Sequence, residues 1–178
     1  MIRPIREDDI AQCLAWYNWY IEHTAITFEE DVLSLDIFSA RVHRTAEKYP
    51  WLILEEEGRP VGYACLDAFN YRSAYRFTAD VTIYLDPQKT GNGRGTLLFQ
   101  ALEEEAKRRR FHKLISLVTE GNQASEHLHE KLGYRKAAVI ERAGFKFGTW
   151  RSVTWFEKDL LDYEDCPAEP DFSGTEIR

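Results

Sequence analysis

The stretch DVTIYLDPQKTGNGRGT, residues 80–96, decides the fold of this chain. Its first six residues alternate polar and apolar side chains, which is the period of a half-buried strand, and Asp86-Pro87 ends that strand. From Leu97 onward, apolar residues recur at helical spacing. The loop between strand and helix carries three glycines: Gly91, Gly93 and Gly95. Free N–H groups and the helix dipole favour an anion at such a helix start, so the sequence predicts a phosphate-bearing ligand.

Two common phosphate-binding loops do not fit this segment. A P-loop needs Lys followed by Ser or Thr directly after its last glycine, whereas Gly95 is followed by Thr96 and Leu97. A dinucleotide-binding fingerprint would place its third glycine at Thr96 and would begin directly at the end of the strand. A glycine triplet alone is also compatible with a solvated turn, so the flanking segments decide the interpretation.

Strand, loop and helix together resemble the acetyl-CoA site of the GCN5-related N-acetyltransferase (GNAT) family, whose loop pattern is Gln/Arg-x-x-Gly-x-Gly/Ala. Residues 88–93 match that pattern literally, and residues 90–95 keep the family's usual spacing from the strand and to the helix. We prefer the second register, although it places Thr90 where the family has Gln or Arg. The pattern N-x-x-S-x-x-L-H-x-x-x-G-Y at residues 122–134 resembles the family's second signature, a short helix that ends in Gly-Tyr or Gly-Phe.

Within the family, the chain is most similar to the phosphinothricin and methionine-sulfone N-acetyltransferases, over residues 2–160. Four segments carry this similarity: YPWL at 49–52, AD-x-TIYL at 79–85, the helix at 125–132 and G-x-KFG-x-W at 144–150. The resemblance implies a mixed α/β (α+β) fold in which a twisted, mostly antiparallel sheet is flanked by helices. It also implies acetyl-CoA as co-substrate, without a metal, bound by ten residues: Ile83, Tyr84, Leu85, Gly91, Asn92, Gly93, Arg94, Gly95, Thr96 and Asn122.

The resemblance also suggests the groups that carry the chemistry. Asp80, on the polar face of its strand, is the candidate base; the related enzymes usually have Glu there, so the shorter Asp favours a bridging water. An exposed carboxylate in that position could equally be only solvated. His129 is the candidate acid near the sulfur, with a histidine on the helix surface as the alternative. Asn122 caps the short helix, contacts CoA, or does both. In the family this strand splays away from its neighbour, and a backbone N–H corresponding to residues 83–85 stabilises the oxyanion.

Five residues are candidates for substrate binding. Ser73 and Tyr75 align with the substrate loop of the related enzymes, and Arg72 and Arg76 flank it. A guanidinium suits a substrate carboxylate, although arginines that face solvent are the commoner outcome. Phe147 stands where the phosphinothricin enzymes have His and the methionine-sulfone enzymes have Phe. This difference favours methionine sulfone or sulfoximine over phosphinothricin.

The expected reaction is direct transfer of the acetyl group to the α-amine of a small amino acid in a ternary complex. No residue suggests an acyl nucleophile, since Cys65 lies mid-strand among apolar neighbours. Two alternatives stay open: an acetyltransferase for a polyamine, an aminoglycoside or a protein N-terminus, and a CoA-binding sensor without catalysis.

Composition limits the class of protein. The chain has 178 residues, enough for one domain with a core, and its net charge of −7 argues against nucleic acid as a partner. It has no apolar run long enough to span a membrane, and its three cysteines lack the spacing of a disulfide framework or zinc site. We therefore expect a cytoplasmic protein that binds neither membrane nor metal.

Periodicity and turn residues predict the order of elements along the chain. We expect a GNAT domain at 1–161 and a loosely held, acidic, Pro-containing tail at 162–178. The related enzymes imply a homodimer, and the aromatic residues of the first helix offer apolar surface for it, unless they belong to the core: Trp16, Tyr17, Trp19 and Tyr20. The predicted strands are 2–5, 51–54, 61–69, 78–85, 113–119 and two within 135–145 and 151–158, and the predicted helices are 9–20, 34–48, 96–110 and 125–131.

Overall fold

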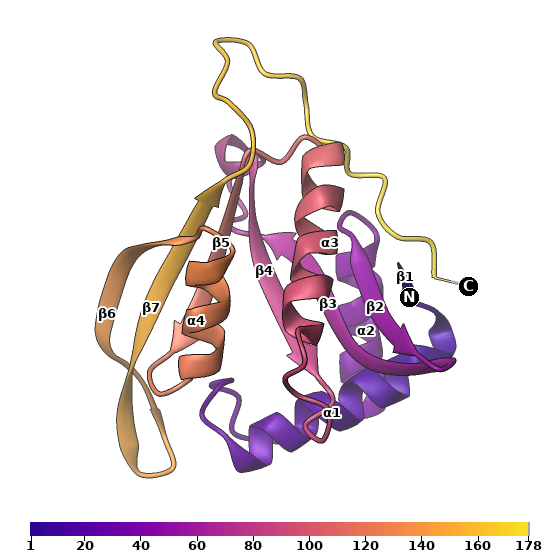
Figure 1. The fold of residues 1–178 in the computed structure, drawn as a ribbon, viewed down its shortest axis with the longest axis vertical. Coiled ribbons are helices and arrows are strands. Elements are labelled where there is room, and N and C mark those ends of the chain that lie inside the picture. Colours follow the sequence, from indigo (N-terminus) through magenta and orange to yellow (C-terminus); the bar gives the residue numbers. More distant parts are fainter. Residues whose placement is uncertain (178) are drawn as a thin grey trace.

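The computed structural model describes residues 1–177 as one twisted sheet with helices on both faces (Figure 1). The seven strands are β1 (Ile2–Pro4), β2 (Trp51–Glu56), β3 (Arg59–Ala68), β4 (Thr78–Leu85), β5 (Lys113–Thr119), β6 (Arg135–Lys146) and β7 (Thr149–Asp159). The helices are α1 (Ile10–His23), α2 (Leu35–Ala46), α3 (Arg94–Arg108) and α4 (Gln123–Lys131), with short 3-10 turns η1 (Glu7–Asp9) and η2 (Ser73–Tyr75). The predicted fold class is confirmed, and every predicted element has its counterpart.

The strands lie in the order β1-β2-β3-β4-β5-β7-β6. All neighbouring pairs are antiparallel except β4 and β5, which are parallel and are joined through the crossover helix α3. The sheet is therefore mixed but mostly antiparallel, as expected. No helix of the described residues combines the length and the apolar character needed to cross a bilayer.

Two hydrophobic cores lie on opposite faces of the sheet, and β3 serves both. Ala64 and Leu66 face α3, whereas Tyr63 and Cys65 face α1 and α2, because successive side chains of a strand point to opposite sides. Figure 1 shows the same division, with α3 and α4 over one face and α1 and α2 behind the other. The strand β4 in the middle of the sheet is thus supported from both sides.

The first helix contributes to the core more than to the surface. Trp16, Tyr17 and Tyr20 are buried, and only Trp19 is exposed, by 39%. The interpretation of these aromatics as core residues is therefore right for three of the four. Asp9 is the N-cap residue of α1, but its carboxylate makes no cap hydrogen bond to that helix and instead accepts two hydrogen bonds from the Arg3 guanidinium.

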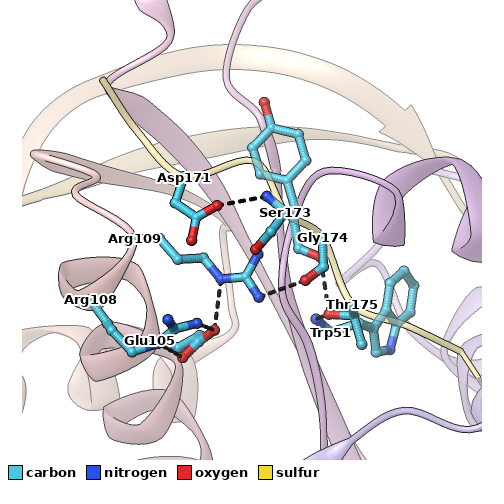
Figure 2. A network of polar contacts seen from close by, with 9 residues as sticks. Trp51, Glu105, Arg108, Arg109, Asp171, Ser173, Gly174 and Thr175 are labelled. Atoms are coloured by element: carbon cyan, nitrogen blue, oxygen red, sulfur yellow. Dashed lines mark hydrogen bonds and ion pairs between the residues drawn. The ribbon is translucent and has the colours of Figure 1, made fainter. Parts of the chain in front are cut away.

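The segment after β7 is not loosely held, contrary to expectation. Phe172 packs edge-on against the rings of Tyr49 and Phe111, at centroid distances of 5.7 Å each. Thr175 accepts a hydrogen bond from the Trp51 N–H, and Arg109 donates one to the Gly174 carbonyl oxygen at 2.7 Å (Figure 2). The acidic composition failed as a predictor here because a few apolar and polar anchors are sufficient to hold an extended segment. Residue 178 of the predicted tail lies outside the described residues.

Candidate active site

Strands β4 and β5 pair only at their beginnings and then diverge. Thr78, Ala79 and Asp80 pair with residues 113–115 of β5, and the rest of β4 pairs with no strand of the described residues on that side. Strand β5 continues along β7 over its whole length, so the divergence opens a gap in the sheet. The family resemblance implies such a splayed strand, and the register confirms it. Asp80 belongs to the last pair and therefore lies at the vertex of the gap.

The backbone groups that face this gap alternate along β4. The Asp86 N–H donates to the Val61 carbonyl oxygen on β3 at 2.9 Å. In an antiparallel pair, hydrogen-bonded residues alternate with residues whose N–H and C=O point away from the partner strand. The N–H groups of Ile83 and Leu85 therefore face the gap, whereas the N–H of Tyr84 faces β3. Of the three residues expected to supply an oxyanion donor, Tyr84 has the wrong orientation.

The glycine loop turns sharply before α3. Gly91, Asn92 and Gly93 all have positive φ angles, of 85°, 52° and 76°, a conformation that glycine adopts without strain. Gly93 is the N-cap residue, and its carbonyl oxygen accepts the first helical hydrogen bond from the Leu97 N–H at 2.9 Å. The Arg94 N–H turns back to the Gly91 carbonyl oxygen at 3.2 Å, whereas the N–H groups of Gly95 and Thr96 have no acceptor within the helix, as an anion site at this position would require.

Arg94 and Asn92, both expected to bind the cofactor, do not line the cleft beside the loop. The Arg94 guanidinium forms two hydrogen bonds of 2.8 Å with the Glu56 carboxylate, and a third to the Lys89 carbonyl oxygen. Arg94 therefore fastens the loop to the end of β2. No sequence pattern indicates this contact, because Glu56 lies 38 positions before Arg94 along the chain.

A cleft of about 620 Å³ lies where β4 diverges from β5, between the end of β4 and helix α4. The Gly95 position is free of a side chain, and a Cβ atom there would come within 3.3 Å of Leu128 on α4. Eight of the ten residues expected to bind the cofactor line the cleft: Ile83, Tyr84, Leu85, Gly91, Gly93, Gly95, Thr96 and Asn122. The Asn122 side chain also accepts a hydrogen bond from the Ser125 N–H, which confirms its role as the cap of α4.

One wall of the cleft was not predicted. It comes from the end of α1 and the following loop, through Trp19, Tyr20, Thr24 and Ile26. The aromatic run of α1 was visible in the sequence, but nothing in it separates residues that face the core from residues that face a ligand. Only the long-range contact of Tyr20 with the end of β4 reveals this wall.

Asp80 is set apart from the other carboxylates by its surroundings. It lies opposite Asp67 of β3, and its Oδ1 atom is buried without a hydrogen-bond partner among the described residues. Burial, and to a smaller extent the Asp67 charge, raises the pKa of Asp80 from 3.8 to about 7. The side chain is on the α1 and α2 face of β4 and does not line the cleft itself. The arrangement supplies a proton acceptor tuned to neutral pH at the vertex of the gap.

His129 is buried in the core, not exposed on the helix surface and not part of the cleft wall. Its side chain is stacked on Phe156 and meets the edges of Phe99 and Tyr134. Its Nδ1 atom donates to the Ser125 carbonyl oxygen at 2.7 Å, and Nε2 has no partner among the described residues. Burial lowers the pKa of His129, so the ring is neutral at neutral pH. This environment does not support the expected role as an acid.

The expected substrate residues lie away from the cleft. Ser73 and Tyr75 form the η2 turn just before β4, which places them at the opposite end of the strand from the glycine loop. Arg76 is occupied by two hydrogen bonds of 2.7 and 2.8 Å to the Glu169 carboxylate. The Arg72 guanidinium lies 4.8 Å from the Tyr71 ring centre and has no carboxylate partner among the described residues.

Phe147 is separate from these residues. It is 58% exposed in the turn between β6 and β7, where its φ is 52°. The Lys146 ammonium lies 5.0 Å from its ring centre and donates to the Thr27 carbonyl oxygen. Within a single copy of the chain, Phe147 therefore does not line the cleft.

Cys65 does not have the environment of an acyl nucleophile, and no metal cluster is found among residues 1–177. Cys65 is buried, and burial raises its pKa well above the ordinary range, which disfavours the thiolate. No group of three or more His, Cys, Asp or Glu side chains in the described part is arranged to hold a metal ion.

Comparisons with known proteins agree with this geometry. The chain is 32% identical to the L-amino acid N-acyltransferase MnaT of Escherichia coli, over 97% of this chain and 99% of that protein. It is also 32% identical to the L-methionine sulfoximine/L-methionine sulfone acetyltransferase of Salmonella typhimurium, over 89% and 95%. The crystal structure of a phosphinothricin acetyltransferase from Sinorhizobium meliloti in complex with acetyl-CoA superposes with a TM-score of 0.89, at 26% identity over 97% of this chain and 95% of that one.

The model of the acetyltransferase (GNAT) family matches residues 13–134, which include the splayed strand β4, the glycine loop and helix α4. The splayed strand, the glycine loop, the comparisons and this match lead to one conclusion: the chain belongs to the GNAT family of acetyl-CoA-dependent N-acetyltransferases.

Proposed function

We propose that this enzyme transfers the acetyl group of acetyl-CoA to the α-amine of a small amino acid or amino-acid analogue. The observation that carries the proposal is the position of Asp80 at the vertex of the β4–β5 gap. There, a carboxylate with an unpartnered buried oxygen and a pKa of about 7 stands beside a strand edge of free N–H donors. A proton acceptor and oxyanion donors together are what amine acetylation requires.

The residues of the cleft fit the parts of acetyl-CoA. The first-turn N–H groups of α3, at Gly95 and Thr96, suit the pyrophosphate, which a chain of net charge −7 must hold by local dipoles. The backbone edge at Ile83 and Leu85 offers hydrogen bonds to the amide-bearing arm, and Asn122 adds a side-chain amide. When bound, acetyl-CoA supplies the activated thioester.

The chemistry then follows from the positions of these groups. Asp80 accepts a proton from the substrate ammonium, directly or through one water. The free amine attacks the thioester carbonyl, and the N–H of Ile83 or Leu85 stabilises the negative charge that develops on its oxygen. A C–N bond forms and the C–S bond breaks. The nitrogen loses one more proton as it becomes an amide nitrogen, and this proton passes through solvent to the leaving CoA thiolate. His129 has no part in this proposal, because its ring is enclosed by aromatic side chains.

An amino-acid substrate is supported by the named activities of the relatives and by Arg72, a cation without a carboxylate partner in the described chain. Phe147 in the KFG segment further favours methionine sulfone or methionine sulfoximine over phosphinothricin as the preferred analogue. The residues 1–161 would form the catalytic domain, with the remaining segment packed onto it.

The test is thiol release from acetyl-CoA against methionine sulfone, methionine sulfoximine, phosphinothricin, spermidine and an aminoglycoside. We expect turnover of the amino-acid analogues only, and its loss in the Asp80→Asn variant. Turnover of spermidine or the aminoglycoside alone would refute the amino-acid substrate class, while the proposed use of acetyl-CoA would stand. Binding of acetyl-CoA without turnover of any amine would favour the sensor.

We also propose that the protein is a cytoplasmic homodimer. The cytoplasm is supported by three cysteines that are all free in the described chain. A dimer is supported by exposed apolar side chains, which gather on the β6–β7 hairpin and not on α1: Val139, Phe145, Phe147 and Trp150. The mass in solution, measured by light scattering, tests the dimer, and a monomer at micromolar concentration would refute it.

A further inference from the structure

Tyr20 connects the first helix to the end of the splayed strand. Its ring is 8% exposed, lines the cleft and lies between the rings of Trp19 and Tyr84, whose centres are each 5.2 Å away. Its hydroxyl donates a hydrogen bond of 3.1 Å to the carbonyl oxygen of Leu85. This hydrogen bond joins residues 65 positions apart in the sequence and is not part of a helix or of strand pairing.

The Leu85 carbonyl is one of the backbone groups that the gap leaves without a strand partner. In the same peptide unit, the Asp86 N–H is bonded to the Val61 oxygen of β3, so the Leu85 carbonyl points to the opposite side, into the gap. A carbonyl in such a place would need water or a ligand donor. Tyr20 satisfies it from within the protein.

The consequence is a difference between the two ends of the strand edge. At Ile83, both the N–H and the C=O remain open to a ligand, whereas at Leu85 only the N–H does. Beyond Leu85, toward the glycine loop, lie the N–H groups of Gly95 and Thr96 in the first turn of α3. At this end of the cleft the edge of β4 therefore presents an N–H donor and no open strand carbonyl, which suits a ligand group that accepts hydrogen bonds.

We propose that Tyr20 is a positioning residue for the CoA part of the substrate: by occupying the Leu85 carbonyl, it removes from the strand edge an acceptor that would repel phosphate or carbonyl oxygens of the ligand. The inference rests on the proposed function, because it assumes that acetyl-CoA occupies the cleft. It assigns Tyr20 no contact with the reacting atoms.

The Tyr20→Phe variant tests this assignment, because phenylalanine keeps the ring and removes only the hydroxyl. In the complex, a Leu85 carbonyl left unpaired against a ligand acceptor should cost about 1–2 kcal/mol, which corresponds to about a 5- to 30-fold weaker Kd for CoA by calorimetry. The KM for acetyl-CoA should rise by a similar factor, while kcat at saturation changes by less than about twofold. A merely structural role would lower Tm without changing the Kd of the folded protein.

Tyr17→Phe is the matched control, since Tyr17 is buried on the same helix but its hydroxyl contacts Thr27 and Glu29. We expect that variant to keep the wild-type Kd for CoA. An unchanged Kd in Tyr20→Phe, or equal weakening in both variants, would overturn the assignment. If Tyr20→Phe does not fold, Tyr20→Leu serves in its place. Wild-type protein that binds no CoA would refute the proposed function itself, and is thus distinguishable from both results.

Discussion

Asp67 and Asp80 lie directly opposite each other on β3 and β4, so two carboxylates share one position of the sheet. The two are not equivalent. Asp67 receives hydrogen bonds from the Ala68 N–H and the Thr45 hydroxyl, whereas Oδ1 of Asp80 is buried without one in the described chain. Burial of the Asp80 carboxyl raises its pKa to about 7, so Asp80 holds a proton up to about neutral pH.

Replacing Asp80 by Asn should remove the base and preserve the shape of the side chain. We expect kcat at pH 7 to fall by about 10²- to 10⁴-fold, the usual contribution of a general base. Wild-type kcat/KM should rise with pH through about 7, and the variant should lack this rise but recover partly at high pH, where the free amine is abundant. The measurement is thiol release between pH 5.5 and 9.5, and unchanged turnover at pH 7 would exclude Asp80 from the mechanism.

Asp67→Asn should act on the same pH profile from the neighbouring strand. The Asp67 charge raises the pKa of Asp80, so its removal should move the acidic limb of kcat/KM to lower pH, by less than the shift that burial causes. Turnover above pH 8 should stay close to wild type, since Asp67 is not proposed to touch the substrate. A limb that stays in place would mean that burial alone sets the pKa of Asp80.

The stability of the protein should also report on Asp80. Folding raises the pKa of this carboxyl from 3.8 to about 7. Below pH 3.8 the group is protonated in both the folded and the unfolded chain, so it does not change the free energy of unfolding. Between pH 3.8 and about 7 it ionises only in the unfolded chain, and the folded state becomes progressively less stable. The full difference corresponds to about 4 kcal/mol. With allowance for partial hydration, we expect Asp80→Asn to raise the free energy of unfolding by about 1–2 kcal/mol at pH 8. The two proteins should converge at pH 4, as urea denaturation at both values can establish; a larger gain at pH 4 would contradict the raised pKa.

Arg72 and Arg76 should differ in their effect on substrates. Arg76 is held by Glu169, whereas Arg72 has no carboxylate partner in the described residues. We therefore expect Arg72→Gln to raise the KM for methionine sulfone by about tenfold, the worth of one charge-assisted contact. Arg76→Gln should raise it less than threefold. The matching amine without a carboxylate group is the control, and its KM should be the same in all three proteins. A larger effect from Arg76 would show that substrate displaces Glu169.

His129→Asn should lower stability and leave the pH profile intact. The ring fills an aromatic pocket, so its loss should cost about 2–4 kcal/mol of unfolding free energy. An acid at this position would instead produce a basic limb in the wild-type profile that disappears in the variant. Thermal unfolding and the profile of kcat against pH distinguish the two roles.

Much of the fold could be predicted, because local patterns determine it. Alternation identified β4, and turn residues separated the elements. What escaped prediction depends on contacts between distant segments. The Tyr20 hydroxyl reaches Leu85, Arg94 reaches Glu56, and His129 turns inward although its helix is mostly polar. The divergence of β4 from β5 is likewise a property of the packed sheet, and only the family resemblance indicated it.

The gap beside β4 bears on how stable the protein is with and without a bound ligand. Past Asp80 the sheet divides into two parts, which are joined only by the short pairing of β4 with β5. A ligand with amide groups would take the place of a strand between them. Occupancy would then link the two halves, and stabilisation would grow with ligand concentration. The metabolic supply of acetyl-CoA would thus govern how long this chain resists proteolysis, as well as how fast it turns over.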